Sequence, residues 1–215
     1  MKHTLPMTTE MTRAILNTRV GSWPPAPIDP EKPTKGRTMR VMKPQPENDG
    51  NAISWRRRGD WHLYVGMKKE AVLDDLASYA PHQPGDVVGF KEAIERGPWG
   101  HAFYVSDGLL CLTPGRNPTS KVVDWTWKPA KLPGLHMPHN LIRLTGEVLR
   151  VTVARPCDLG PDAIQNEGCP PFVGLAHGIG DAQRIWWENL LHSQNPKDPD
   201  IMTRWCWVYE FVRRS

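Results

Sequence analysis

The sequence predicts an α+β protein: a small mixed β-barrel with flanking short helices and large loop insertions. Its 215 residues include 22 prolines, and few long helices are expected because proline interrupts helices and fixes turns. Apolar residues in the last third of the chain alternate with the period of two that is typical of strands. The length is typical of one domain and no internal repeat divides the chain, so residues 1–215 are expected to form a single domain.

The first half of the chain is expected to hold two helices and several short strands. Thr8 or Thr9 can cap a helix over residues 8–18, and a second helical pattern covers residues 68–79. Prolines or a Pro-Gly-Asp turn limit the short strands that are expected over residues 38–43, 61–65 and 87–90. Insertions into the barrel are expected at residues 20–34, which are rich in proline, and at residues 47–80 and 96–128.

The last third of the chain has the clearest strand patterns. Residues 141–153 alternate, and Gly146 indicates a β-bulge within them. Residues 205–212 alternate more regularly, and one face of this strand is aromatic. Two helices are expected between these strands, over residues 160–168 and 180–192, the second with Ile185 and Trp186 on its apolar side.

Charge and cysteine content restrict the class of protein. The formal net charge of +4 permits an anionic partner such as a nucleotide or nucleic acid without requiring one. The four cysteines form no close pair, so reduced thiols and a cytoplasmic location are expected. Residues 1–10 lack the apolar core of a signal peptide, and no apolar stretch is long enough to suggest a membrane span.

No metal and no cofactor are expected. Five residues could be considered as zinc ligands, but their spacing matches no standard zinc site. These residues are His136, His139, Cys157, Cys169 and His177.

Several short motifs occur in an order that resembles a known family. They are Met11 to Leu16, Lys35 to Pro46, Pro84-Gly85-Asp86 before Lys91-Glu92, His136-Met137-Pro138 before Arg143, Asp162-Ala163-Ile164 with Glu167-Gly168, and Trp205 to Phe211. Together they resemble the ASCH domains, a branch of the PUA-like β-barrels, and most closely a set of phage and prophage proteins often labelled morphogenetic. The resemblance covers most of the chain outside the insertions and implies a PUA-like barrel.

The resemblance also implies a function. The ASCH family is associated with binding of RNA or modified nucleosides, and another of its branches is described as a ribonuclease. One compact bacterial branch hydrolyses the acetyl amide of N4-acetylcytidine with a Lys, a Thr three residues later and a Glu after the central strands. These correspond to Lys35, Thr38 and Glu167, and a further family Arg corresponds to Arg40. This chain departs from the family pattern in the insertion at residues 20–34, directly before Lys35.

The chemistry of these residues suits amide hydrolysis, which needs a nucleophile, a proton carrier and a donor for the developing oxyanion. Thr38 offers a hydroxyl, and Lys35 can remove its proton if burial beside Arg37 or Arg40 lowers the lysine pKa. Glu167 can protonate the leaving amine or hold Lys35 in place, and Arg40 can bind an anionic group or a base carbonyl. We therefore predict a metal-independent amidohydrolase acting on an N4-acylated cytidine-type nucleoside, with Lys35, Thr38 and Glu167 as catalytic residues.

The predicted partner is a nucleoside or a single-stranded nucleic acid, with RNA favoured, and no membrane. The residues predicted to bind it are Arg37, Arg40, Lys91, Glu92 and His136. Two other functions stay open: a non-catalytic module of phage origin that binds RNA or a modified base, and an ASCH-type ribonuclease. The same cluster can also be read as a solvated basic strand edge with a structural Glu, and the oligomeric state stays open.

Aromatic and basic residues outside this cluster offer weaker candidates. Arg56-Arg57-Arg58 followed by Trp61 suits a nucleic-acid contact, although a solvated loop explains the charges equally well. Trp125 and Trp127 lie in a loop-rich region and are candidates for stacking on a base.

Overall fold

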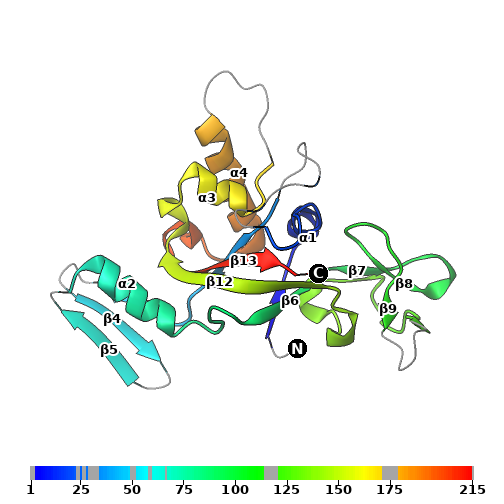
Figure 1. Ribbon diagram of the computed structural model, residues 1–215, viewed down its shortest axis with the longest axis horizontal. Coiled ribbons are helices and arrows are strands. Elements are labelled where there is room, and N and C mark those ends of the chain that lie inside the picture. The colour runs from blue at the N-terminus through cyan, green and yellow to red at the C-terminus, as the bar shows by residue number, and fades with distance from the viewer. Residues whose placement is uncertain are drawn as a thin grey trace.

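The structure is a computed structural model that describes residues 3–22, 25, 28, 34–48, 52–57, 60–65, 67–113, 121–170 and 179–214. Within these ranges the chain forms four sheets and four α-helices (Figure 1). The predicted α+β class is therefore confirmed.

A five-stranded sheet lies at the centre of the molecule, in the order β1-β6-β12-β13-β2. Its strands are β1 (His3–Pro6), β6 (Val87–Lys91), β12 (Leu144–Ala154), β13 (Cys206–Arg213) and β2 (Arg37–Val41). β1 runs parallel to β6, and the other neighbouring strands are antiparallel. Four of these strands lie within a few residues of their predicted positions, whereas the sequence patterns gave no sign of β1.

The central sheet is open between β1 and β2, which corrects the predicted barrel: the described strands do not close into one. The two edges nevertheless approach each other, because Arg40 Nη2 in β2 donates to the backbone oxygen of Pro6, 2.5 Å away at the end of β1. β1 has four residues and ends in Pro6, which has no N–H to extend a ladder. A side chain thus bridges the edges where a barrel would have backbone pairing.

Two small lobes extend from opposite ends of the central sheet (Figure 1). One contains β3 (Glu47–Asn48), β4 (Ala52–Arg57), β5 (Asp60–Val65) and α2 (Lys69–Ser78). The other contains β7 (Ile94–Arg96), β8 (Ala102–Tyr104), β9 (Leu112–Thr113), β10 (Lys121–Val122) and β11 (Lys131–Leu132). Single 3-10 turns lie at Pro98–Gly100, Gly134–His136, His139–Leu141, Pro156–Asp158 and Ile201–Thr203.

Three further helices pack near the centre: α1 (Thr9–Leu16), α3 (Pro161–Asn166) and α4 (Ile179–Gln194). Thr8 caps α1, since its side chain accepts a hydrogen bond from the Met11 N–H. In α4 the buried aromatic residue is Trp187, whereas Ile185 is 59% exposed. The apolar side predicted for this helix is therefore wrong at Ile185.

The strand β13 separates two apolar cores, as its alternation predicts. Trp207, Tyr209 and Phe211 belong to one core together with Phe90. Cys206 and Val208 belong to a second core, which includes residues of α3 and α4. The two faces of β13 thus pack into two different apolar cores.

The bulge in β12 lies at Leu149 and not at Gly146. The register with β13 shifts between Val148 and Arg150, and Leu149 is the extra residue. Gly146 has a different role, because a Cβ there would lie 2.8 Å from the Phe90 ring. The glycine allows the sheet to pack closely on that ring.

Candidate functional site

Lys35 lies directly before β2 and is held between the ends of two helices. Its backbone N–H donates to Thr18 Oγ1 after α1, at 3.0 Å. The next residue, Gly36, donates to the backbone oxygen of Asn166 at the end of α3, at 3.1 Å. The Lys35 side chain is fully buried, so these contacts fix both its backbone and the direction of its ammonium group.

Glu167 faces Lys35 because of the way α3 ends. Glu167 is the C-cap residue of α3, and Gly168 follows it with a φ of +99°, the left-handed conformation that glycine adopts readily. A Cβ at Gly168 would lie 3.3 Å from Ala14 Cβ and 3.8 Å from the Lys35 side chain. The Glu-Gly pair therefore brings α1, α3 and Lys35 into close contact.

Lys35 and Glu167 form a fully buried ion pair. The lysine Nζ lies 2.8 Å from Glu167 Oε2 and 2.7 Å from the backbone oxygen of the same residue. Burial lowers the pKa of Lys35, against the opposing effect of Glu167, and the positive charges of Arg40 and Arg37 lower it further. A lysine in this setting loses its proton more readily than an exposed one.

Thr38 and Arg40 follow Lys35 in the chain and lie on one face of β2. Each is paired with an aromatic residue of β13, Thr38 with Tyr209 and Arg40 with Trp207. Burial lowers the pKa of Arg40, and Glu167 is the strongest influence opposing that effect. We call Lys35, Thr38, Arg40 and Glu167 the Lys35 cluster.

Several buried polar atoms of the Lys35 cluster lack a hydrogen-bond partner within the described part of the chain. They are Thr38 Oγ1, Arg40 Nε and Glu167 Oε1. Native proteins satisfy most buried polar groups, and each one left unsatisfied costs about 1–3 kcal/mol. Three such atoms in one cluster are the arrangement expected of a site that binds a polar ligand.

Two cavities adjoin the Lys35 cluster at Arg40. The large cavity, of about 710 Å³, is lined by residues 6–11, Arg40, Ala93, Lys131, residues 133–135 and Gln194. The small cavity, of about 300 Å³, is lined by residues 39–41, Lys43, Leu191, residues 194–195, Ile201 and Cys206. The large cavity includes residues from both edges of the sheet, so the opening between β1 and β2 provides its space. Arg40 lines both cavities and is influenced by the charge of Glu167, whereas Lys35, Thr38 and Glu167 are not among the lining residues of either cavity.

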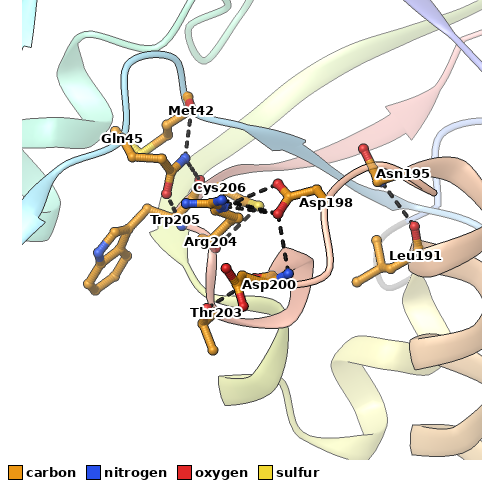
Figure 2. A network of polar contacts seen from close by, with 10 residues as sticks. All are labelled: Met42, Gln45, Leu191, Asn195, Asp198, Asp200, Thr203, Arg204, Trp205 and Cys206. Carbon is orange, nitrogen blue, oxygen red and sulfur yellow. Dashed lines mark hydrogen bonds and ion pairs between the residues drawn. The ribbon is translucent and has the colours of Figure 1, made fainter.

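The wall of the small cavity is fixed by a polar network (Figure 2). Gln45 donates to the backbone oxygens of Met42 and Trp205, at 2.7 and 3.0 Å, and accepts from the Trp205 N–H at 2.7 Å. Arg204 is paired with Asp198 at 3.0 Å in the segment between α4 and β13. The Gln45 contacts hold the end of β2 against the start of β13, whereas the Arg204–Asp198 pair lies within the segment that leads into β13.

Arg37 lies on the opposite face of β2 from Thr38 and Arg40 and forms an ion pair with Glu210 of β13. Its Nε has no hydrogen-bond partner among the described residues. Arg37 therefore influences the Lys35 cluster through its charge.

Lys91 and Glu92 lie at the end of β6, and their contacts favour a structural role. Lys91 Nζ donates to the backbone oxygen of Leu135 at 3.2 Å, beside the large cavity. Both carboxylate oxygens of Glu92 accept hydrogen bonds, Oε1 from Arg143 at 2.8 Å and Oε2 from Arg143 and Ser106 at 3.0 and 2.6 Å. Arg143 also pairs with Asp107 at 2.8 Å. We call Glu92, Ser106, Asp107 and Arg143 the Arg143 cluster.

None of the remaining candidates that the structure describes lines either cavity. His136 is exposed and is not among the residues that line either cavity. The ring centroids of Trp125 and Trp127 lie 4.9 Å apart, and both side chains pack on the core of their own lobe. These contacts favour a structural role for both residues. The side chains of Arg56, Arg57 and Trp61 and all of Arg58 and His177 lie outside the part of the chain that is described.

Sequence patterns missed Lys131 and Gln194, which line the large cavity. Lys131 comes from the lobe after β6 and Gln194 from the end of α4. A lysine in a polar loop and a glutamine at a helix end are typical of solvated surfaces, so neither carried a usable signal.

Comparisons with known proteins add no relatives, since no family model, no curated protein and no solved structure matches this chain. Among the described helices, none has the length and apolar character needed to cross a membrane. The described residues also contain no group of three or more His, Cys, Asp or Glu side chains placed to hold a metal ion.

Proposed function

We propose that this protein is a metal-independent amidohydrolase that removes the acyl group from an N4-acylated cytidine-type nucleoside. The fold would be a PUA-like domain of the ASCH type whose sheet is opened between β1 and β2, in a protein of the cytoplasm. The observation that supports the proposal is the buried Lys35–Glu167 pair, together with the unpartnered Thr38 hydroxyl and Arg40 Nε on the strand that follows Lys35. These residues carry the chemical groups that an amide hydrolase needs.

The large cavity supplies room for the nucleoside. Its volume of about 710 Å³ falls within the range of about 300–1,000 Å³ of small-molecule sites. Its walls are largely apolar, with Met7, Met11 and Leu135 among them, which suits a base and an acyl group. Arg40 lies at the cavity wall and donates toward the substrate carbonyl.

The first half of the reaction forms an acyl-enzyme ester. Lys35, as a neutral amine, takes the proton of the Thr38 hydroxyl, and Thr38 Oγ1 attacks the acyl carbon. The carbonyl oxygen becomes an oxyanion, which the guanidinium of Arg40 stabilises. The proton passes from Lys35 to Glu167 across their 2.8 Å contact and then to the departing N4 nitrogen as the amide C–N bond breaks.

The second half releases the acid and restores the enzyme. Lys35 takes a proton from a water molecule, and the resulting hydroxide adds to the ester carbon. The bond between that carbon and Thr38 Oγ1 breaks, and the proton held by Lys35 returns to the threonine oxygen. Thr38 Oγ1 has no hydrogen-bond partner among the described residues, and its contact with Lys35 is expected to form when substrate is bound.

The test is turnover by the purified protein. N4-acetylcytidine and related acylated nucleosides are incubated with the wild type, and the free nucleoside and acid are measured. The variant Lys35→Met, which keeps the length and removes the amine, should lower kcat/KM by about 10²–10⁴-fold. Lys121→Met, at an exposed lysine, serves as the matched control and should match the wild type. Turnover that is equal in the Lys35→Met variant and the wild type contradicts the proposal.

A second candidate, a non-catalytic module that binds RNA or a modified base, is favoured by one observation. Lys35 Nζ already contacts both the carboxylate and the backbone oxygen of Glu167, and such a pair can simply position Arg40 to bind a ligand. Binding of single-stranded RNA or N4-acetylcytidine without any product would support this function. Cleavage of the RNA itself would instead indicate a ribonuclease.

A further inference from the structure

The large and small cavities share two lining residues, Arg40 and Gln194. They therefore meet at Arg40 and extend from it in different directions. The large cavity continues past the start of α1 toward Lys131, and the small cavity continues along the edge of β2 toward Lys43. A ligand that fills only the large cavity leaves the small one empty.

The lining of the small cavity combines apolar surface with cationic and amide groups. Met39, Leu191 and Ile201 provide apolar side chains, whereas Lys43 and Asn195 provide hydrogen-bond donors. Lys43 is exposed, so its ammonium group can reach a ligand at the cavity mouth. Such a lining suits a flat heterocycle that is linked to an anionic group.

The open edge of β2 adds backbone donors to this cavity. Phe211 donates to the Gly36 oxygen and Met42 donates to the Trp205 oxygen, so the even-numbered residues of this segment face β13. Because the direction alternates along a strand, the N–H groups of Met39 and Val41 face away from β13, at the edge of the sheet. Met39 and Val41 both line the small cavity.

The charges of the two cavities form a series with Arg40 at its centre. Lys131 lines the large cavity, Arg40 lines both, and Lys43 lines the small one, against the single carboxylate of Glu10 in the large cavity. An uncharged mononucleoside cannot form ion pairs with these cationic side chains. A nucleic-acid strand carries a phosphate between successive nucleosides and can form them.

We infer that the small cavity is a second nucleotide subsite and that the ligand is a short single-stranded nucleic acid. The acylated nucleoside occupies the large cavity, and its neighbour along the strand occupies the small cavity, where Lys43 contacts the linking phosphate. This inference rests on the proposed function, because it takes the large cavity as the nucleoside site.

The inference is tested by measuring affinity against ligand length. Dissociation constants are measured for cytidine 5′-monophosphate and for a tetracytidylate, by calorimetry at low salt. The tetranucleotide should bind about tenfold more tightly than the mononucleotide, because a second subsite and further phosphates are engaged. Equal affinity for the two ligands would overturn the inference.

The variant Lys43→Gln locates the effect. It should reduce the ratio between the two affinities toward one and lower the slope of log affinity against log salt by about 0.7 for the tetranucleotide. Lys121→Gln, at an exposed lysine in the β9–β10 sheet, is the matched control and should keep the wild-type ratio. An unchanged ratio in Lys43→Gln would overturn the inference.

Two further outcomes separate this inference from the others. An acidic heptapeptide that displaces the tetranucleotide at a similar concentration would show that the cavities take an anionic peptide, which overturns the inference. Length-dependent binding without hydrolysis of any acylated nucleoside supports the subsite and contradicts the amidohydrolase. Hydrolysis of an acylated nucleoside with an affinity that does not depend on ligand length supports the amidohydrolase and contradicts the second subsite.

Discussion

Among the described residues, the Lys35 cluster and the Arg143 cluster differ in how completely their polar groups are paired. In the Arg143 cluster both oxygens of Glu92 accept hydrogen bonds, and the Ser106 hydroxyl both donates and accepts. In the Lys35 cluster the Thr38 hydroxyl, one oxygen of Glu167 and the Arg40 Nε have no partner among the described residues. Both clusters combine carboxylate, guanidinium and hydroxyl groups, but the Lys35–Glu167 pair is fully buried, whereas the side chains of Arg143 and Asp107 are 22% and 26% exposed.

The difference indicates different uses. A fully paired network holds its surroundings in one conformation, as the Arg143 cluster holds the end of β6 against the start of the neighbouring lobe. A partly paired network leaves donors and acceptors for a molecule that is not part of the chain. We therefore propose a structural role for the Arg143 cluster and, in line with the proposed function, ligand binding and catalysis for the Lys35 cluster.

The largest expected effect comes from removing one carboxylate from each cluster. Glu92→Gln should lower the free energy of unfolding by about 1.5–3 kcal/mol, because an amide NH2 replaces an oxygen that accepts from Arg143 or Ser106, although Arg143 keeps Asp107 as a charged partner. Glu167→Gln should cost about 1–3 kcal/mol, because Lys35 keeps the backbone oxygen of residue 167 and the new amide oxygen as acceptors. Urea unfolding of both variants measures the two losses.

The slope of the urea transitions provides the control, since equal slopes show that the unfolded states of the variants are comparable. A greater loss in Glu167→Gln than in Glu92→Gln would contradict the distinction between the clusters. A loss of turnover in Glu167→Gln at a urea concentration far below its transition would place the defect in the reaction.

The pH dependence of turnover sharpens the same comparison. The pKa of Lys35 is lowered from its ordinary value of 10.5, chiefly by burial, and the reaction needs the neutral amine. The rate kcat/KM should therefore rise about tenfold per pH unit on the acidic side and level off at a pH below 10.5. A rate that falls as the pH rises through this range would show that the protonated lysine is the active form.

The sequence predicted an element of the fold where the signal for that element lies within its own residues. Alternation in β13 and the Thr8 cap of α1 are local signals, and both are confirmed. The strand β1 was missed because its pairing with β6 joins residues far apart in the chain, such as Leu5 and Phe90. Because β1 is one of the two edges of the open sheet, the gap between β1 and β2 was not predicted either.

The candidate site shows the same limit. Spacing and resemblance placed Lys35, Thr38 and Glu167 in one group, and the structure brings Lys35 and Glu167 into direct contact. Sequence patterns could not show which of Glu92 and Glu167 is fully paired, because the pairing depends on residues distant in the chain: Arg143 donates to Glu92, whereas Glu167 Oε1 has no described partner. Pairing in space, and not residue type, distinguishes the two carboxylates.

The smallest change in stability gives the sharpest contrast between the clusters. Thr38→Val removes a buried hydroxyl that has no described partner, so it should leave the unfolding free energy unchanged or raise it by about 1 kcal/mol. Ser106→Ala is the matched variant in the other cluster, and it should lower stability by about 1–3 kcal/mol because Glu92 and Arg143 lose a partner.

The most direct test of the account is therefore Thr38→Val, measured for unfolding free energy and for turnover of N4-acetylcytidine on the same preparation. The account predicts a protein at least as stable as the wild type that has lost turnover, because the hydroxyl serves the reaction at some expense to the fold. A variant that is clearly less stable and still turns over substrate would contradict it, since Thr38 would then belong to the structure and not to the site.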